Sequence, residues 1–67
     1  MTPIEAVYVQ AGDIAVTVTS RRRYGATTYT WLRFVGPGID AQPDPWPCTM
    51  PARAEVLAEA ARLRGAR

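Results

Sequence analysis

Histidine, lysine and asparagine are absent from this chain of 67 residues, and cysteine occurs once, at Cys48. Without histidine, the chain lacks the side chain that most often serves as a general base at neutral pH and as a metal ligand. The lone thiol lies between Pro47 and Thr49 with no imidazole to activate it, so we interpret it as a small packing residue. The sequence therefore predicts no catalytic residue, no metal site, no cofactor and no enzymatic activity.

Signals for export or membrane insertion are also missing. Residues 1–8 contain neither the basic region nor the long apolar region of a signal peptide. No stretch approaches the roughly 20 apolar residues that a membrane-spanning helix needs. Because one cysteine cannot form an internal disulfide, a reducing environment fits best, and we expect a cytoplasmic protein without a membrane partner.

Large apolar residues are few, because eleven of the hydrophobic residues are alanine and phenylalanine occurs once. Burying a large apolar side chain contributes about 1.5 to 3 kcal/mol, while ordering each residue costs on the order of 1.5 kcal/mol. These terms nearly cancel in one small domain spanning residues 1–67, so we expect self-association or a partner. The net charge of +2 is too small to indicate nucleic acid by itself.

Two β-branched runs, residues 4–11 and 14–20, alternate in polarity on either side of Gly12-Asp13. This pattern is typical of a β-hairpin with a two-residue type II′ turn. The turn and the hydrophobic pattern then agree on one register. The predicted pairs are Val9 with Val16 and Val7 with Val18.

A third strand is expected over residues 26–35. We favour a three-residue loop of Arg23-Tyr24-Gly25 before it, with Gly25 in the left-handed conformation, because this loop makes one sheet face continuously apolar. The pairs it predicts are Ile14 with Phe34, Val16 with Leu32, and Val18 with Thr30. A two-residue Tyr24-Gly25 turn would instead scatter the small aliphatic side chains over both faces.

Residues 36–50 are rich in proline and glycine and show no periodicity, so we expect a long irregular loop. A helix over residues 51–64 follows, capped by Thr49 or Met50 and with Pro51 in its first turn. One arc of this helix is apolar and should face the sheet. The arc contains Val56, Leu57, Ala60, Ala61 and Leu63. The expected fold is α+β, a three-stranded antiparallel meander with one C-terminal helix packed on one face.

The predicted registers place aromatic side chains on the sheet face that a single helix leaves uncovered. The rows of this face are Tyr8, Thr17 and Trp31, then Ala6, Thr19 and Tyr29, and then Gln10, Ala15 and Arg33. Aromatic rings beside arginine suit a protein interface, including self-association, and also a platform for stacking single-stranded bases. In a third interpretation, the long loop folds back and Trp46 covers these rings as a second small core.

Arg21, Arg22 and Arg23 should stand at a hairpin tip together with Tyr24. Such a tip could bind phosphates or an acidic protein surface, or it could be a solvated loop of like charges. The prolines between residues 43 and 51 favour an extended strap that presents Trp46. Trp46 then either anchors the strap to its own domain or binds a partner.

Together these features predict a non-catalytic protein-binding module that occupies a surface, as an inhibitor, adaptor or assembly factor would. An inhibitor carried by a phage or mobile element is one such case. The partner is another protein, a second copy of the chain, or both, and we expect a homo-oligomer. The alternative is a nucleic-acid-binding module that uses an arginine-rich hairpin and an aromatic sheet face. The candidate partner-binding residues are Tyr8, Arg21, Arg22, Arg23, Tyr24, Tyr29, Trp31, Arg33 and Trp46.

Overall fold

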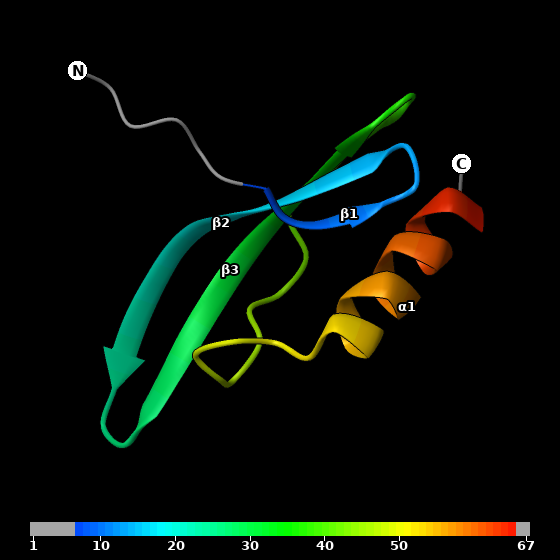
Figure 1. Cartoon of the computed structure of the whole chain (residues 1–67). Helices are drawn as coiled ribbons and strands as arrows, with labels where there is room; N and C mark the ends of the chain where they lie inside the picture. Colours follow the sequence, from blue (N-terminus) through cyan, green and yellow to red (C-terminus); the bar gives the residue numbers. More distant parts are fainter. Residues whose placement is uncertain (1–6, 66–67) are drawn as a thin grey trace.

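In the computed structural model, which describes residues 7–65, an antiparallel sheet carries one helix on one face (Figure 1). The elements are β1 (Val7–Ala11), β2 (Ile14–Tyr24), β3 (Thr27–Gly36), β4 (Ile39–Ala41) and α1 (Arg53–Gly65). Each strand pairs with its neighbour in the sequence, in the order β1-β2-β3-β4. This confirms the predicted α+β meander with a C-terminal helix and adds a short fourth strand. Residues 4–6, predicted in the first strand, lie outside the described residues.

The turn between β1 and β2 is the predicted one. Ala11 pairs with Ile14, which leaves Gly12 and Asp13 as the two central residues. Gly12 has a φ of 64°, and positive φ is confined to glycines in the described residues. A positive φ at the first central position alone defines a type II′ turn. The predicted pairing of Val9 with Val16 is confirmed.

The turn between β2 and β3 differs from both predicted forms. Tyr24 pairs with Thr27, so the turn is Gly25-Ala26, and Gly25 takes a φ of 62°. This is again a type II′ geometry with glycine at the first central position. The predicted three-residue loop is therefore wrong, and its strand pairs are wrong by two residues. The observed pairs at the apolar end are Val16 with Phe34 and Val18 with Leu32.

An irregularity at Thr19 explains how the new turn and the apolar face coexist. The register shifts by one residue between Val18 and Ser20, as in a β-bulge. Without the shift, the tight turn would place the aliphatic side chains of β2 opposite the wrong pleat of β3. The extra residue restores Val16 and Val18 to the same face as Leu32. The predicted composition of that face is thus confirmed for Ile14, Val16, Val18, Leu32 and Phe34, although its register is not.

A second shift lies between Val7 and Val9. Val7 pairs with Thr17 rather than with the predicted Val18, and its side chain is 49% exposed on the face away from the helix. Tyr8 is consequently turned to the core side, where its ring packs against the buried cluster. The predicted row of Tyr8, Thr17 and Trp31 is therefore wrong.

The segment predicted as an irregular loop contains β4 and a further attachment to β3. Gly36 pairs with Ile39 across Pro37-Gly38, and Gly38 has a φ of 73°, as the third position of a type II turn requires. Farther along, Trp46 forms an isolated antiparallel bridge with Thr30, with N–O distances of 2.9 and 3.0 Å. The proline-rich loop thus lies along the edge of β3.

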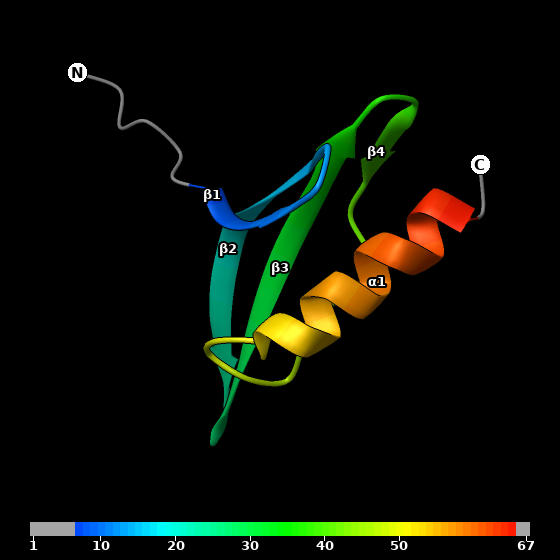
Figure 2. The same cartoon turned by 45° about the vertical axis from the view of Figure 1, so that its right-hand side comes forward.

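The core lies between the sheet and α1 (Figure 2). Its buried residues are Val9, Ala11, Ile14, Val16, Leu32, Phe34, Ile39, Val56 and Ala60. Leu57 and Leu63 are partly buried against this cluster as predicted, whereas Ala61 is exposed. The helix that the structure describes is too short and too polar to cross a membrane.

Helix α1 starts later than predicted, at Arg53, and the Val56 amide donates to the Ala52 carbonyl. Thr49 and Met50 therefore do not cap it, and Pro51 lies before it. Both ends of the helix are tied to β1 and its turn. The Tyr8 hydroxyl donates to the Pro51 carbonyl at 2.7 Å, and Arg64 Nη2 donates to the Ala11 carbonyl at 2.9 Å. These bonds hold the helix across β1.

Candidate interaction surface

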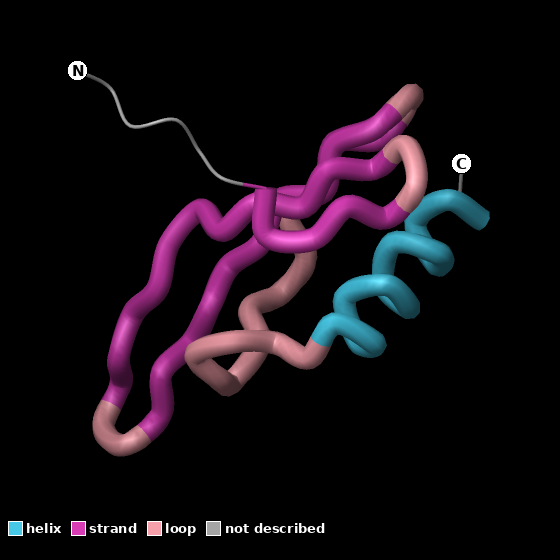
Figure 3. The backbone as a smooth tube through the Cα atoms, viewed as in Figure 1, coloured by secondary structure: helices cyan, strands magenta, loops and turns pink. Residues whose placement is uncertain are grey.

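The β2–β3 hairpin continues well beyond the rest of the sheet. The last β1 pair on β2 is at Thr17, and the last β4 pair on β3 is at Phe34. Residues 20–31, which we call the distal hairpin, therefore extend past both short strands and away from α1 (Figure 3). Within the described ranges, only the loop at Trp46 reaches the edge of β3 in this region. The distal hairpin is the part of the described chain with the least covering structure.

Three aromatic rings lie together on the face of the distal hairpin that points away from the helix. The ring centroids of Tyr24 and Tyr29 are 5.8 Å apart in an edge-to-face arrangement, and those of Tyr29 and Trp31 are 6.5 Å apart. Tyr24 is 58% exposed, while Tyr29 and Trp31 are half-buried beside their neighbours. Arg22 stands directly opposite Tyr29 on the same face. We call Arg22, Tyr24, Tyr29 and Trp31 the aromatic patch.

The three consecutive arginines are exposed near the tip of the β2–β3 hairpin, as predicted, but they lie in β2 and not in a loop. Because successive strand residues point to opposite faces, Arg22 joins the aromatic patch while Arg21 and Arg23 point to the other side. Arg21 Nε donates to the Thr49 carbonyl at 3.0 Å, and Arg23 Nε donates to the Gly25 carbonyl at 2.9 Å. Of these three arginines, only Arg22 therefore lies beside the rings.

Arg33 lies on the same face as the aromatic patch but is engaged by its own chain. Its Nε and Nη2 donate to the two carboxylate oxygens of Asp40 at 2.9 and 2.7 Å. These hydrogen bonds hold the pKa of the Asp40 carboxyl below its ordinary value of 3.8. Val7 and Val35 are exposed near this pair. The outer face thus carries the Arg33–Asp40 ion pair and exposed valines near β4, and the aromatic patch on the distal hairpin.

Tyr8 and Trp46 do not belong to this outer face. Tyr8 is held against the core side by its hydrogen bond to Pro51. Trp46 also packs on the core side, with its ring centroid 6.2 Å from that of Phe34. It anchors the loop to its own domain, and it does not cover Tyr29 and Trp31. The interpretation of a second small core under Trp46 is therefore wrong.

Thr30 is a residue that the sequence pattern does not single out. It is fully buried, and its hydroxyl donates to the Cys48 carbonyl at 2.6 Å, with the Thr49 carbonyl 3.0 Å away. Together with the backbone bridge to Trp46, this bond fastens the loop to β3. Thr30 lies two residues before Leu32 in β3, so the two side chains share the core-facing side of the sheet. A polar residue in this position is the sequence signal for such an anchor.

No group of three or more metal-ligating side chains occurs among residues 7–65. Comparison of the chain with protein-family models, with curated proteins and with solved structures finds no match, so the surface is interpreted from its geometry alone.

Proposed function

We propose that this protein is a small non-catalytic binding module whose aromatic patch contacts another protein, a second copy of the chain included. The observation that carries the proposal is the contiguous row of Tyr24, Tyr29 and Trp31 on a hairpin that extends from the sheet. Tyrosine, tryptophan and arginine are the residues enriched at the energetic centres of protein interfaces. Rings already packed on one another also lose little conformational freedom when a partner docks.

The arrangement of the arginines favours protein over nucleic acid as the partner. A nucleic-acid platform combines stacking rings with several cations that follow the phosphate backbone. Among residues 7–65, Arg22 alone stands among the rings, since Arg21 and Arg23 point to the opposite face and Arg33 binds Asp40. Binding of single-stranded nucleic acid by the same rings remains the alternative function.

The absence of catalytic activity is part of the proposal. The chain has no imidazole, and Cys48 is half-buried in the loop that carries Trp46. A protein of this kind acts by occupying a surface, as an inhibitor, adaptor or assembly factor does. A homo-oligomer would bury the patch on a second copy.

The first test measures molecular mass against concentration by sedimentation equilibrium for the wild type and for Trp31→Ala. We expect wild-type self-association, weakened by about 2 kcal/mol or more in Trp31→Ala, which is roughly a 30-fold rise in Kd. Circular dichroism should show that the variant monomer stays folded. Met50→Ala is the matched control, since Met50 is 68% exposed and lies outside the patch.

A second experiment, a titration, distinguishes protein binding from nucleic-acid binding. Short single-stranded DNA and RNA are titrated at several salt concentrations, in the wild type and in Arg22→Gln. A monomeric protein with salt-dependent affinity for these strands, and a slope lowered by about one in Arg22→Gln, would contradict the protein-binding proposal and support the alternative.

A further inference from the structure

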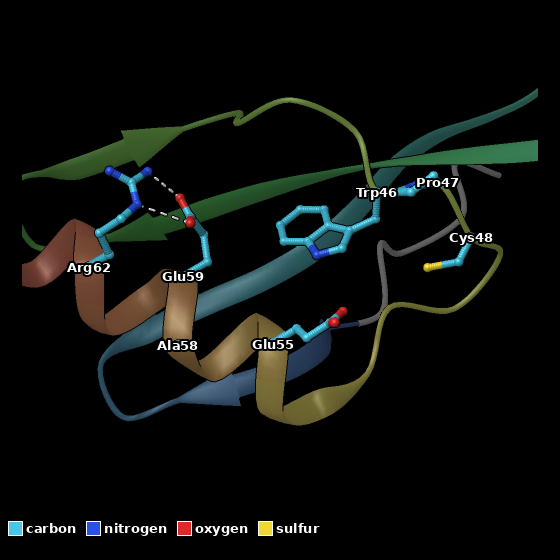
Figure 4. Close-up of a pocket in the computed structure, with 7 residues that line it drawn as sticks. All are labelled: Trp46, Pro47, Cys48, Glu55, Ala58, Glu59 and Arg62. Carbon is cyan, nitrogen blue, oxygen red and sulfur yellow. Dashed lines mark hydrogen bonds and ion pairs between the residues drawn. The ribbon is translucent and has the colours of Figure 1, made fainter.

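A groove lies on the other side of the molecule from the aromatic patch, between the proline-rich loop and α1 (Figure 4). Its volume is 610 Å³, within the range of about 300 to 1,000 Å³ typical of ligand sites. Its lining residues are Trp46, Pro47, Cys48, Glu55, Ala58, Glu59 and Arg62. The groove therefore combines an indole with charged side chains of the helix.

One guanidinium of the chain itself, that of Arg62, binds a carboxylate in the groove. Arg62 Nε donates to Glu59 Oε1 at 3.0 Å, and its Nη2 donates to Glu59 Oε2, so the pair is a two-pronged fork. The Glu59 side chain is only 19% exposed and is part of the groove lining. This pair accounts for one carboxylate and one cation, and Glu55 supplies a second carboxylate.

The Glu55 side chain is exposed and forms no hydrogen bond or ion pair with the side chains and backbone of residues 7–65. Figure 4 shows its side chain extending from the first turn of α1 toward the loop that carries Trp46 and Cys48. With Glu59 and Arg62 balanced against each other, the groove keeps one negative charge, although the whole chain carries +2. Its charge is therefore complementary to a cation.

We propose that this groove binds an arginine side chain of a partner protein, with the guanidinium between the Trp46 indole and the Glu55 carboxylate. A planar guanidinium stacks on an indole and donates two parallel hydrogen bonds to a carboxylate, whereas a compact ammonium has no plane to stack and meets both groups as a point charge. The occupant is thus a basic segment of a protein. The site is separate from the aromatic patch and does not depend on the function proposed for it.

The two tryptophans provide a direct test by NMR, because Trp46 lines the groove and Trp31 lies on the opposite face. Acetyl-Gly-Arg-Gly-amide is titrated into ¹⁵N-labelled protein while the two indole N–H signals are followed. We expect a saturating shift of the Trp46 signal, with a Kd on the order of 1 mM, and a stationary Trp31 signal. The same tripeptide with citrulline in place of arginine should cause no such shift.

Matched charge changes locate the site. Glu55→Gln should weaken arginine binding roughly tenfold, because it removes a charge-assisted hydrogen bond. Asp44→Asn removes the same charge from an exposed loop residue outside the lining and should leave binding unchanged. Trp31→Ala should also bind normally, so failure at the aromatic patch is distinguishable from failure here. Equal effects of Glu55→Gln and Asp44→Asn, equal binding of the citrulline tripeptide, or no Trp46 shift would overturn the proposal.

Discussion

The two ends of the β2–β3 hairpin have different surroundings although they belong to the same two strands. At the proximal end, β1 and β4 flank the hairpin, α1 covers one face, and Ile14, Leu32 and Phe34 are fully buried. At the distal end, neither short strand continues, and the rings of Tyr24 and Tyr29 lie on an open face. One hairpin thus combines a packed end that supports folding with a projecting end that is available for contacts.

This difference shows where a small domain with few large apolar residues places its buried side chains. Nearly all fully buried side chains belong to the proximal end, where removal of apolar surface from water stabilises the fold. Thr30 and the loop at Trp46 form the boundary, since they fasten β3 just where the flanking strands stop. We therefore expect side chains beyond that boundary to contribute less to folding.

The largest expected effect compares truncations at the two ends. Phe34→Ala should lower the free energy of unfolding by about 3 to 5 kcal/mol, because the side chain is fully buried beside Trp46. Tyr29→Ala should lower it by about 1 kcal/mol or less, the usual worth of a cross-strand aromatic pair. Urea unfolding followed by circular dichroism measures both. If Phe34→Ala is unfolded in water, Phe34→Leu gives a measurable transition, and an equal cost at Tyr29 would contradict this difference between the two ends.

A smaller effect compares two glycines. A Cβ at Gly36 would lie 2.9 Å from Ile14 Cγ1 and 3.0 Å from the Asp13 carbonyl, so Gly36→Ala should cost about 1 to 3 kcal/mol. Gly25→Ala meets nothing within 4 Å and should cost about 1 to 3 kcal/mol through its positive φ alone.

The size of the new side chain separates these two causes. Serine should be worse than alanine at position 36, where atoms are crowded, and equal to alanine at position 25, where space is open. The four unfolding free energies are compared in urea. A cost at position 25 that grows with side-chain size would show that the distal turn is packed after all.

The smallest effect concerns the exposed ion pair of Arg33 with Asp40. Because the pKa of folded Asp40 is lowered by the hydrogen bonds from Arg33, the carboxylate stabilises the fold above its unfolded pKa, and this contribution is lost as the pH falls through the folded pKa. Asp40→Asn should therefore be slightly less stable than the wild type at pH 7 and indistinguishable from it near pH 2. Thermal melts at both pH values measure the difference. A deficit that persists in acid would assign the effect to the packing of β4 instead.

The apolar face of β2 and β3 is predicted correctly, whereas the pairing register between these strands is not, and the β-bulge at Thr19 explains the difference. Alternation in β2 and β3 identifies Val16, Leu32 and Phe34 as partners on one face, whichever neighbours they have. Alternation alone predicts strand pairs without extra residues. In the structure the pairing register shifts by one residue at Tyr8 in β1 and at Thr19 in β2. A bulge has no sequence signal as strong as a turn glycine, so Val7 and Tyr8 were assigned to the wrong faces.

The candidate surface follows the same pattern. Tyr29 and Trp31 were expected on the uncovered face because their spacing in β3 is two, and they lie there in contact. Tyr24 and Arg22 join them only because the Thr19 bulge reverses the faces of the following β2 residues. Glu59 lies outside the predicted apolar arc of the helix, yet its side chain is only 19% exposed and lines the groove between α1 and the loop that carries Trp46.

Local chemistry in the sequence determined the hairpins, the helix and the apolar face, since glycine at turns and the alternation of β-branched residues act over a few neighbouring positions. The fourth strand, the position of Trp46 and the separation of the arginines were decided by tertiary structure. Each of these depends on pairing between residues distant in the chain, such as Thr30 with Trp46 or Arg21 with Thr49. Such pairs form because buried backbone groups require hydrogen-bond partners and because burying apolar rings removes them from water. No local sequence pattern specifies which distant residues supply these contacts.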